Sequence, residues 1–122
     1  MIFYSNLESM NTLNPHETSR RDTIQALIAS HPIMLFIKGS PEYPLCGFSK
    51  TVVEILKNYA VNFGYFDVLS DDAVRQEIKI FSDWPTFPQL YVQGVLIGGC
   101  DIVKVLHEQG ALKERLFLKK DG

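Results

Sequence analysis

Apolar residues follow helical spacing in some segments of the chain and form strand-like runs in others. Ile24, Leu27 and Ile28 stand at i, i+3 and i+4, the spacing of one face of an amphipathic helix. The unbroken apolar run Ile33–Ile37, bounded by proline on one side and by lysine and glycine on the other, is typical of a strand buried on both faces. In chain order, the predicted elements are a helix from Thr18 or Ser19 to His31, a strand at Ile33–Ile37, a helix starting at or just after Cys46, a strand at Asn62–Val68, a helix capped by Asp71 or Asp72, strands at Gln89–Val92 and Val95–Ile97, a helix capped by Asp101, and a last helix containing Leu112 and Leu116.

This order of elements predicts an α/β fold with a four-stranded mixed sheet. The first two strands are joined through a helix, and a right-handed crossover makes such strands parallel. A Gln93-Gly94 turn joins the last two strands, which makes them an antiparallel hairpin. The predicted fold is therefore βαβ followed by ββα, with helices on both faces of the sheet and an extra helix before it.

The two ends of the chain are predicted to lie outside this fold. Residues 1–17 contain Glu8 and Glu17, no Lys or Arg, and no continuous apolar segment. We therefore interpret them as a disordered polar tail rather than a secretory signal or a transit peptide. Met10 is an alternative start of the chain. Residues 18–119 form the predicted domain, and residues 120–122 form a short C-terminal tail.

Composition and charge argue against several classes of protein. The 122 residues are 46% apolar and 21% charged, as in one ordinary folded domain. Twelve basic and 14 acidic residues give a net charge of −2, which argues against a nucleic-acid partner. No apolar run approaches the ~20 residues of a membrane span, so a membrane partner is not expected either. Two cysteines far apart in the sequence make no disulfide scaffold, and we expect a reducing compartment, the cytoplasm.

Cys46 carries the most chemical information. It stands where a loop rich in Pro and Gly is predicted to meet the first turn of a helix. A thiol at that place feels the partial positive charge of the unpaired helix N–H groups, which favours the thiolate. A thiolate is both a nucleophile and a metal ligand. The alternative, a buried apolar cysteine, is common for free Cys but fits an exposed junction less well.

Ser49 occupies the position at which a Cys-x-x-Cys motif would have its second cysteine. Cys46 therefore has no neighbour in this motif with which to form a redox disulfide. Thiol exchange would need a partner thiol from Cys100, from another protein, or from a small thiol such as glutathione. Metal binding would need ligands from elsewhere, because one thiolate is far short of the usual four.

Short motifs lie in the loops and at the helix starts of the predicted fold. They are Lys38-Gly39-Ser40-Pro41, Cys46-Gly47-Phe48-Ser49, Trp84-Pro85-Thr86-Phe87-Pro88-Gln89 and Gly98-Gly99-Cys100-Asp101. Together they resemble the monothiol (CGFS-type) glutaredoxin family of the thioredoxin fold, in the family's order and spacing. The resemblance extends from about Thr18 to Lys119. The seven residues between Lys38 and Cys46 are similar to the longer loop of the monothiol branch.

The resemblance implies roles for individual residues in binding glutathione. Lys38 would offer its ammonium group to a carboxylate of glutathione or to the Cys46 thiolate. Arg75 would bind the glycine carboxylate as a planar donor. The Phe87-Pro88 bond is expected to be cis, with the Phe87 backbone turned outward to pair with an extended peptide. The other positions assigned to the glutathione site are Gly47, Phe48, Thr86, Pro88 and Gly99.

A second carboxylate site is implied at the start of the following helix. Gly98-Gly99 would let the chain approach a ligand closely, and the N–H groups of Cys100 and Asp101 would bind the carboxylate. Asp101 would cap that helix and also meet the ammonium group of the ligand. Cys100 could contribute mainly its N–H or act in redox chemistry, and a disulfide with Cys46 needs Cα atoms within ~7 Å.

The resulting hypothesis is an iron–sulfur carrier. Two chains would each supply Cys46 and two glutathione molecules would each supply a thiolate, giving the four sulfurs that hold a [2Fe–2S] cluster at a homodimer interface. Exchangeable ligands suit the transfer of the cluster to iron–sulfur acceptor proteins. The resemblance adds BolA-like proteins as partners.

Two alternatives stay open from the sequence. Cys46 could instead attack a protein–glutathione mixed disulfide, with a second glutathione regenerating the thiolate. The chain would then be a glutathione-dependent oxidoreductase, an activity that the resemblance implies to be weak. It could also be a thioredoxin-fold binding module whose cysteine is incidental.

Overall fold

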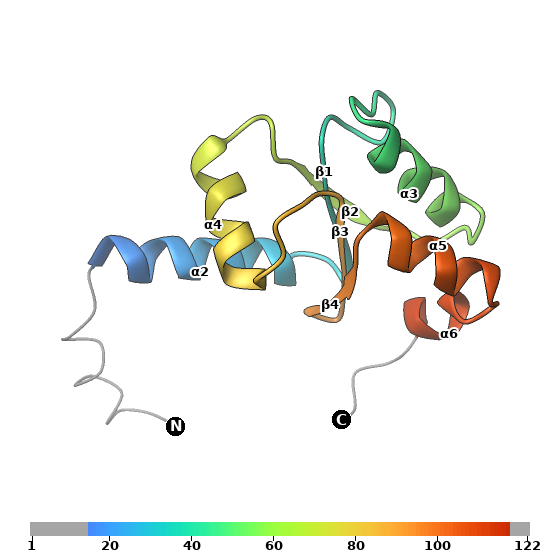
Figure 1. Ribbon diagram of the computed structural model, residues 1–122. Helices are drawn as coiled ribbons and strands as arrows, with labels where there is room; N and C mark the ends of the chain where they lie inside the picture. Colours follow the sequence, from blue (N-terminus) through green and yellow to red (C-terminus); the bar gives the residue numbers. More distant parts are fainter. Residues whose placement is uncertain (1–14, 118–122) are drawn as a thin grey trace, which may run out of the picture.

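The computed structural model describes residues 15–117, which form a four-stranded sheet with helices on both faces (Figure 1). The elements in chain order are α2 (Pro15–Ala29), β1 (Ile33–Ile37), α3 (Gly47–Lys57), β2 (Gly64–Asp67), α4 (Asp72–Ser82), β3 (Gln89–Val92), β4 (Val95–Gly98), α5 (Cys100–Glu108) and α6 (Leu112–Leu116). The strands lie in the order β2-β1-β3-β4. β1 is parallel to β2 and antiparallel to β3, and β3 and β4 form an antiparallel hairpin. The predicted mixed sheet is confirmed.

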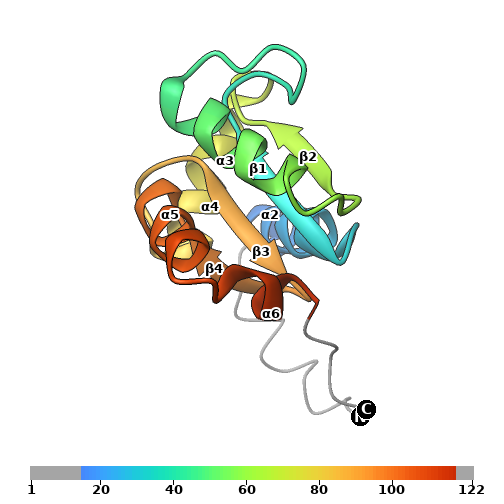
Figure 2. The same ribbon diagram turned by 90° about the vertical axis from the view of Figure 1, so that its right-hand side faces the viewer.

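Side chains of β1 point alternately to the two faces of the sheet, and each face has its own core. Ile33, Leu35 and Ile37 pack on the face covered by α3, α5 and α6, whereas Met34 and Phe36 pack on the face covered by α2 and α4 (Figures 1 and 2). All five side chains are at most 6% exposed. Because burying one such side chain stabilises the fold by about 1.5–3 kcal/mol, β1 is the strand that holds the two layers of helices together.

Some helices and strands begin or end at residues other than those predicted. α2 begins at Pro15, three residues before the predicted cap, because proline suits the first turn of a helix, where its missing N–H is not needed. The tail predicted for residues 1–17 overlaps this helix, and its first 14 residues lie outside the described part of the chain. α2 ends at Ala29 rather than His31. β2 is shorter than predicted, because it pairs only with the four residues from Met34 to Ile37 of β1.

The prediction that Asp101 caps α5 was wrong. Gly99 is the N-cap, Cys100 is the first helical residue, and Asp101 lies in the first turn. The N–H of Val103 donates to the Gly99 carbonyl at 3.0 Å, which closes this turn without a capping side chain from the described chain. The N–H groups of Cys100 and Asp101 therefore stand at the helix start, where the helix itself has no acceptor for them.

The strand ends place the sequence motifs at one edge of the sheet. Phe36 of β1 pairs with Gln89 of β3, so the chain just after β1 and the chain just before β3 lie side by side. Leu90 of β3 pairs with Gly98, which brings the end of β4 to the same edge. Across residues 15–117, no helix is both long enough and apolar enough to cross a membrane.

Candidate functional site

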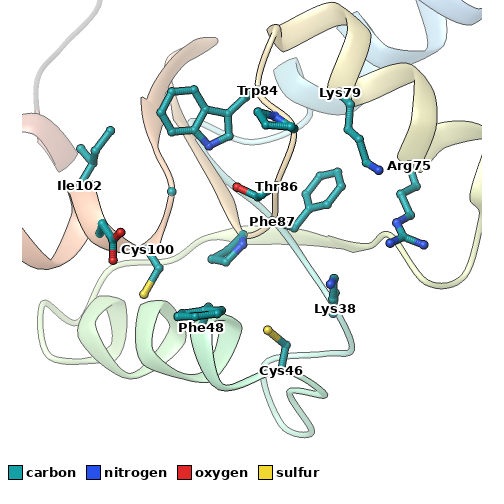
Figure 3. Close-up of a pocket in the computed structure, with 14 residues that line it drawn as sticks. Lys38, Cys46, Phe48, Arg75, Lys79, Trp84, Thr86, Phe87, Cys100 and Ile102 are labelled. Atoms are coloured by element: carbon teal, nitrogen blue, oxygen red, sulfur yellow. The ribbon is translucent and has the colours of Figure 1, made fainter.

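A cavity of about 460 Å³ opens at this edge of the sheet (Figure 3). Its walls come from the chain after β1, the start of α3, one side of α4, the loop before β3 and the start of α5. The lining residues are Lys38, Cys46, Phe48, Arg75, Lys79, Trp84, Pro85, Thr86, Phe87, Pro88, Gly99, Cys100, Asp101 and Ile102. Every residue predicted for the glutathione site lines this cavity except Gly47, which is the first residue of α3.

The loop between β1 and α3 is closed by its own backbone. The N–H of Leu45 donates to the Lys38 carbonyl at 2.9 Å, and Ser40 and Tyr43 exchange backbone hydrogen bonds of 3.2 and 3.1 Å. Gly39 makes the turn at φ +95°, and a Cβ there would stand 2.5 Å from the Tyr43 carbonyl oxygen. The loop is therefore a closed hairpin that fixes how the chain enters α3.

Side chains from two other elements hold the start of this loop. The Lys38 N–H donates to the hydroxyl of Ser49, which is fully buried, at 3.2 Å. The Gly39 N–H donates to the carboxylate of Asp67, the last residue of β2, at 2.9 Å. Asp67 was not predicted as a site residue, because the sequence placed it inside the strand Asn62–Val68 and does not show that this strand lies beside the Gly39 loop.

Cys46 is the N-cap of α3, and its side chain is half-buried at the cavity. Partial burial raises the pKa of the Cys46 thiol, but several groups stabilise the thiolate and outweigh this effect. They are the backbone N–H groups of Ser49 and Phe48, the positive charge of Lys38, and the Ser49 hydroxyl. The pKa of Cys46 consequently lies below the ordinary value of a thiol, in agreement with a thiolate at a helix start.

The cationic residues that line the cavity lie together on one side of it. Lys38 follows β1, whereas Arg75 and Lys79 stand four residues apart on α4 and therefore on one face of that helix. Asp71 caps α4, as one of the two predicted options, with its carboxylate accepting the Val74 N–H at 3.1 Å. Arg75 Nε is buried and has no hydrogen-bond partner among the described residues.

The opposite wall is the start of α5, and Figure 3 shows Cys100 and the cationic side chains on opposite sides of Phe87. It offers the N–H groups of Cys100 and Asp101 and the exposed Asp101 carboxylate. A Cβ on Gly99 would stand 3.2 Å from both the Pro88 carbonyl oxygen and Trp84 Nε1. A side chain on Gly99 would therefore need one of these neighbours to shift by a few tenths of an ångström where this wall meets the loop before β3.

The middle of the cavity is formed by the loop from Trp84 to Pro88. The Phe87-Pro88 bond is cis, as predicted. Phe87 is 6% exposed and belongs to the core between the sheet and α2 and α4, whereas Thr86 is exposed. Trp84 is half-buried and also lines the cavity.

Four lining residues were not predicted as site residues. They are Lys79, Trp84, Pro85 and Ile102. The spacing of Lys79 from Arg75 and the motif that contains Trp84 and Pro85 were available signals. Ile102 carries no sequence signal of this kind, because an apolar residue in a helix is expected in the core.

Both cysteines are free thiols in this structure, and both line the cavity. Cys100 is 9% exposed. Burial raises the pKa of the Cys100 thiol, and the negative charge of Asp101 raises it further against the opposing charge of Lys104. In the view of Figure 3, the Phe48 ring falls between the two sulfur atoms. Cys46 is therefore the thiol that the cavity activates.

Within residues 15–117, no group of three or more His, Cys, Asp or Glu side chains is placed to hold a metal ion. Any metal centre at Cys46 would need further ligands from outside the described chain.

The fold and the cavity define a class of protein. A βαβ–ββα sheet carries one activated thiol at a helix start, beside a cis-proline and between a cationic wall and a helix N-terminus. This arrangement is that of a thioredoxin-fold thiol protein without a second cysteine in the motif.

Comparison with known proteins narrows the class to a family. The family model named Glutaredoxin matches residues 33–97. Probable monothiol glutaredoxin 2 of Rickettsia prowazekii is 54% identical over 93 residues, which cover 76% of this chain and 87% of that protein. The solution structure of reduced poplar apo GrxS14 superposes with a TM-score of 0.70 at 43% identity, covering 79% of this chain and 88% of that one. The chain belongs to the monothiol glutaredoxin family.

Some relatives are much longer than this chain. Monothiol glutaredoxin-S17 of Arabidopsis thaliana is 58% identical over 100 residues, which cover 82% of this chain but 20% of that protein. Monothiol glutaredoxin-S11 of rice is likewise matched over 20% of its length. The chain thus spans about a fifth of these plant proteins.

Proposed function

We propose that this chain binds glutathione in the cavity and, using the thiols of Cys46 and glutathione as ligands, carries a [2Fe–2S] cluster between two copies of itself for transfer to acceptor proteins. The observation that carries the proposal is the position of the activated thiol. Cys46 has a lowered pKa and borders a cavity with cations on one side and a helix start on the other.

The charges of the cavity fit a tripeptide with a carboxylate at each end. Lys38, Arg75 and the neighbouring Lys79 would bind the glycine carboxylate, and the buried Arg75 Nε, which has no partner within residues 15–117, offers a donor for it. The N–H groups at the start of α5 would bind the other carboxylate, and Asp101 the adjacent ammonium group. The backbone of Phe87 lies between these ends, so an extended ligand would bring its thiol toward Cys46.

The ligand count accounts for the proposed cluster. Each chain supplies one accessible thiolate, Cys46, while Cys100 is buried and its pKa is raised. One chain and one glutathione thus give two sulfurs, and a homodimer gives four. The cluster is the cargo, and the role of this chain is to present the Cys46 thiolate and to hold glutathione beside it. We propose BolA-like proteins and iron–sulfur acceptor proteins as partners, and the cytoplasm as the compartment.

Anaerobic incubation with iron, sulfide and glutathione tests the cluster proposal. The wild-type chain should gain visible absorption and the mass of a dimer only when glutathione is present. Cys46→Ser should stay colourless and monomeric, whereas the matched control Cys100→Ser should behave as wild type. A colourless wild-type monomer, or a cluster formed equally well without glutathione, would contradict the proposal.

A second candidate function is reduction of protein–glutathione mixed disulfides. The same activated thiol favours this reaction, because Ser49 has no sulfur and cannot form a disulfide with Cys46 within the motif. The Cys46 thiolate would attack the glutathione sulfur, forming a Cys46–glutathione disulfide and releasing the target thiolate. A glutathione thiolate would then attack the glutathione sulfur of that disulfide, releasing oxidised glutathione and the Cys46 thiolate.

Reduction of a glutathionylated peptide separates this candidate from the cluster carrier. The enzyme is favoured if the chain binds no cluster and turns over fast, and if this turnover is abolished in Cys46→Ser and retained in Cys100→Ser. A cluster-binding chain with slow turnover would favour the carrier.

A further inference from the structure

A buried polar network lies behind the cavity wall formed by the Trp84–Pro88 loop. Gln89 is fully buried, and its Nε2 donates to the backbone carbonyls of Trp84 at 3.0 Å and Thr86 at 3.3 Å. The hydroxyl of Tyr91 donates to Gln89 Oε1 at 2.9 Å. Gln89 and Tyr91 are two residues apart on β3 and therefore share a face of the sheet. The carboxamide thus joins the loop to the strand that follows it.

These hydrogen bonds fix the orientation of the carboxamide. Nε2 can only donate and Oε1 can only accept, so a flipped amide would turn Oε1 toward the two carbonyl oxygens and lose both hydrogen bonds to the loop. Burial raises the pKa of Tyr91, against a smaller opposing effect of Ser82, so the phenol keeps the proton that it donates. A buried polar group without a partner is costly, and the network therefore has one stable arrangement.

The network determines where the next N–H points. The Thr86 carbonyl and the Phe87 N–H belong to one peptide unit, which is planar, and the cis bond of this loop is the following one, Phe87-Pro88. In a planar trans unit the C=O and the N–H point in opposite directions. Because Gln89 holds the Thr86 carbonyl toward the interior, the Phe87 N–H is turned away from Gln89, toward the cavity that Phe87 lines.

We propose that Gln89 is a positioning residue for ligand binding: it aims the Phe87 N–H into the cavity, and Tyr91 holds Gln89 in the orientation required for this. The inference rests on the proposed binding of glutathione as a peptide that pairs with the Phe87 backbone. It assigns a role in the site to two buried residues that do not line the cavity.

Calorimetry with glutathione on a set of variants tests the proposal. Gln89→Leu removes both donors at similar side-chain size, and it should weaken binding by about tenfold, the loss expected for one misaligned hydrogen bond. Tyr91→Phe should weaken binding by about threefold, since the carboxamide keeps its loop contacts but loses the group that orients it. The double variant should bind no more weakly than Gln89→Leu, because Tyr91 acts only through Gln89.

Tyr59→Phe is the matched control. It also removes a tyrosine hydroxyl, one that contacts His107 Nδ1 at 2.6 Å outside the cavity, and it should leave glutathione binding unchanged. Trp84 is the only tryptophan of the chain, so its fluorescence reports on the loop. The emission maximum should shift in Gln89→Leu but not in Tyr59→Phe. The pH dependence of Cys46 alkylation should be the same in all variants.

The possible results separate this inference from the proposed function. A wild-type chain that binds no glutathione overturns both. If the wild-type chain binds glutathione and a folded Gln89→Leu binds it within twofold of wild type, only the role of Gln89 is overturned. The same holds if the losses of affinity in Gln89→Leu and Tyr91→Phe multiply in the double variant. If Gln89→Leu does not fold, glutathione binding by Tyr91→Phe and Gln89→Glu tests the role of Gln89. Gln89→Glu should bind weakly at neutral pH and recover toward wild type as the pH falls, because the protonated carboxyl regains one donor.

Discussion

The backbone N–H of Lys38 donates a 3.2 Å hydrogen bond to the hydroxyl of Ser49, which is fully buried in the first turn of α3. The same hydroxyl is among the groups that lower the pKa of Cys46. Serine therefore has two partners at the place where a dithiol motif has its second cysteine. It ties the end of β1 to the start of α3 and stabilises the Cys46 thiolate, and it offers no sulfur for a disulfide.

Replacing Ser49 by alanine should raise the pKa of Cys46. The thiolate loses one hydrogen-bond donor, so less of it is present at neutral pH and alkylation of Cys46 slows. The Lys38 N–H also loses its acceptor, which should lower the free energy of unfolding by about 1–2 kcal/mol. The pH dependence of the alkylation rate and urea unfolding measure the two effects.

Thr51→Ala is the control for Ser49→Ala. The Thr51 hydroxyl bonds the Gly47 carbonyl at 3.0 Å on the same helix. This variant should leave the pH dependence of Cys46 alkylation as in wild type. An unchanged pKa of Cys46 in Ser49→Ala would show that the hydroxyl has no effect on the thiolate.

Lys79→Ala should weaken glutathione binding several-fold. Lys79 adds a positive charge beside Arg75 on the wall where we place a carboxylate. Charge interactions at a partly solvated site are screened, so the difference from wild type should shrink as salt is raised from about 0.01 M to 1 M. Lys57→Ala, at an exposed position near the end of α3 and outside the cavity, should bind as wild type at every salt concentration. If Lys79→Ala and Lys57→Ala bind glutathione equally well, Lys79 does not contribute to the site.

Gly39→Ala should destabilise the fold. Gly39 has φ +95°, and an added Cβ would stand 2.5 Å from a backbone oxygen and 2.8 Å from the Leu45 nitrogen. Backbone strain of this kind costs about 1–3 kcal/mol, and moving the loop to relieve the contact adds to it. Gly47→Ala is the control, because nothing lies within 4 Å of a Cβ there and alanine favours a helix. Urea unfolding should show a clear loss for Gly39→Ala and none for Gly47→Ala.

The order of elements could be predicted because each segment has a distinct local pattern. The apolar run Ile33–Ile37 is flanked by breakers, and its alternate residues fill the two cores, as expected of a central strand. Local pattern failed at the start of α5. Asp101 is a good capping residue, yet Gly99 is the N-cap, and the Val103 N–H closes the first turn on the Gly99 carbonyl. The helix starts directly after β4, whose last residue, Gly98, pairs with Leu90 of β3, and a pairing between strands is not visible in the local pattern.

The residues of the candidate site could be predicted where they belong to a recognisable sequence motif. Cys46 and Asp101 were found through the resemblance and through helix-start chemistry, and the structure brings them to one cavity. Lys79 was missed although it stands four residues after Arg75, a predicted site residue, and therefore on the same face of the helix. The role inferred for Gln89 was hidden because its hydrogen bonds depend on how the loop folds back over β3.

The two cysteines should react at different pH values. The thiolate is the reactive form, so the alkylation rate of each thiol rises with pH through its own pKa. The pKa of Cys46 is lowered and that of Cys100 is raised, so Cys46 is ionised at pH values where Cys100 is not. Iodoacetamide at neutral pH should therefore modify Cys46 faster than Cys100, as followed by mass spectrometry. Cys100→Ser and Cys46→Ser isolate the two rate profiles, with the midpoint for Cys46 below that of free cysteine and the midpoint for Cys100 above it. In urea the two rates should converge, because unfolding removes both environments; equal rates in the folded protein would mean that the site does not activate Cys46.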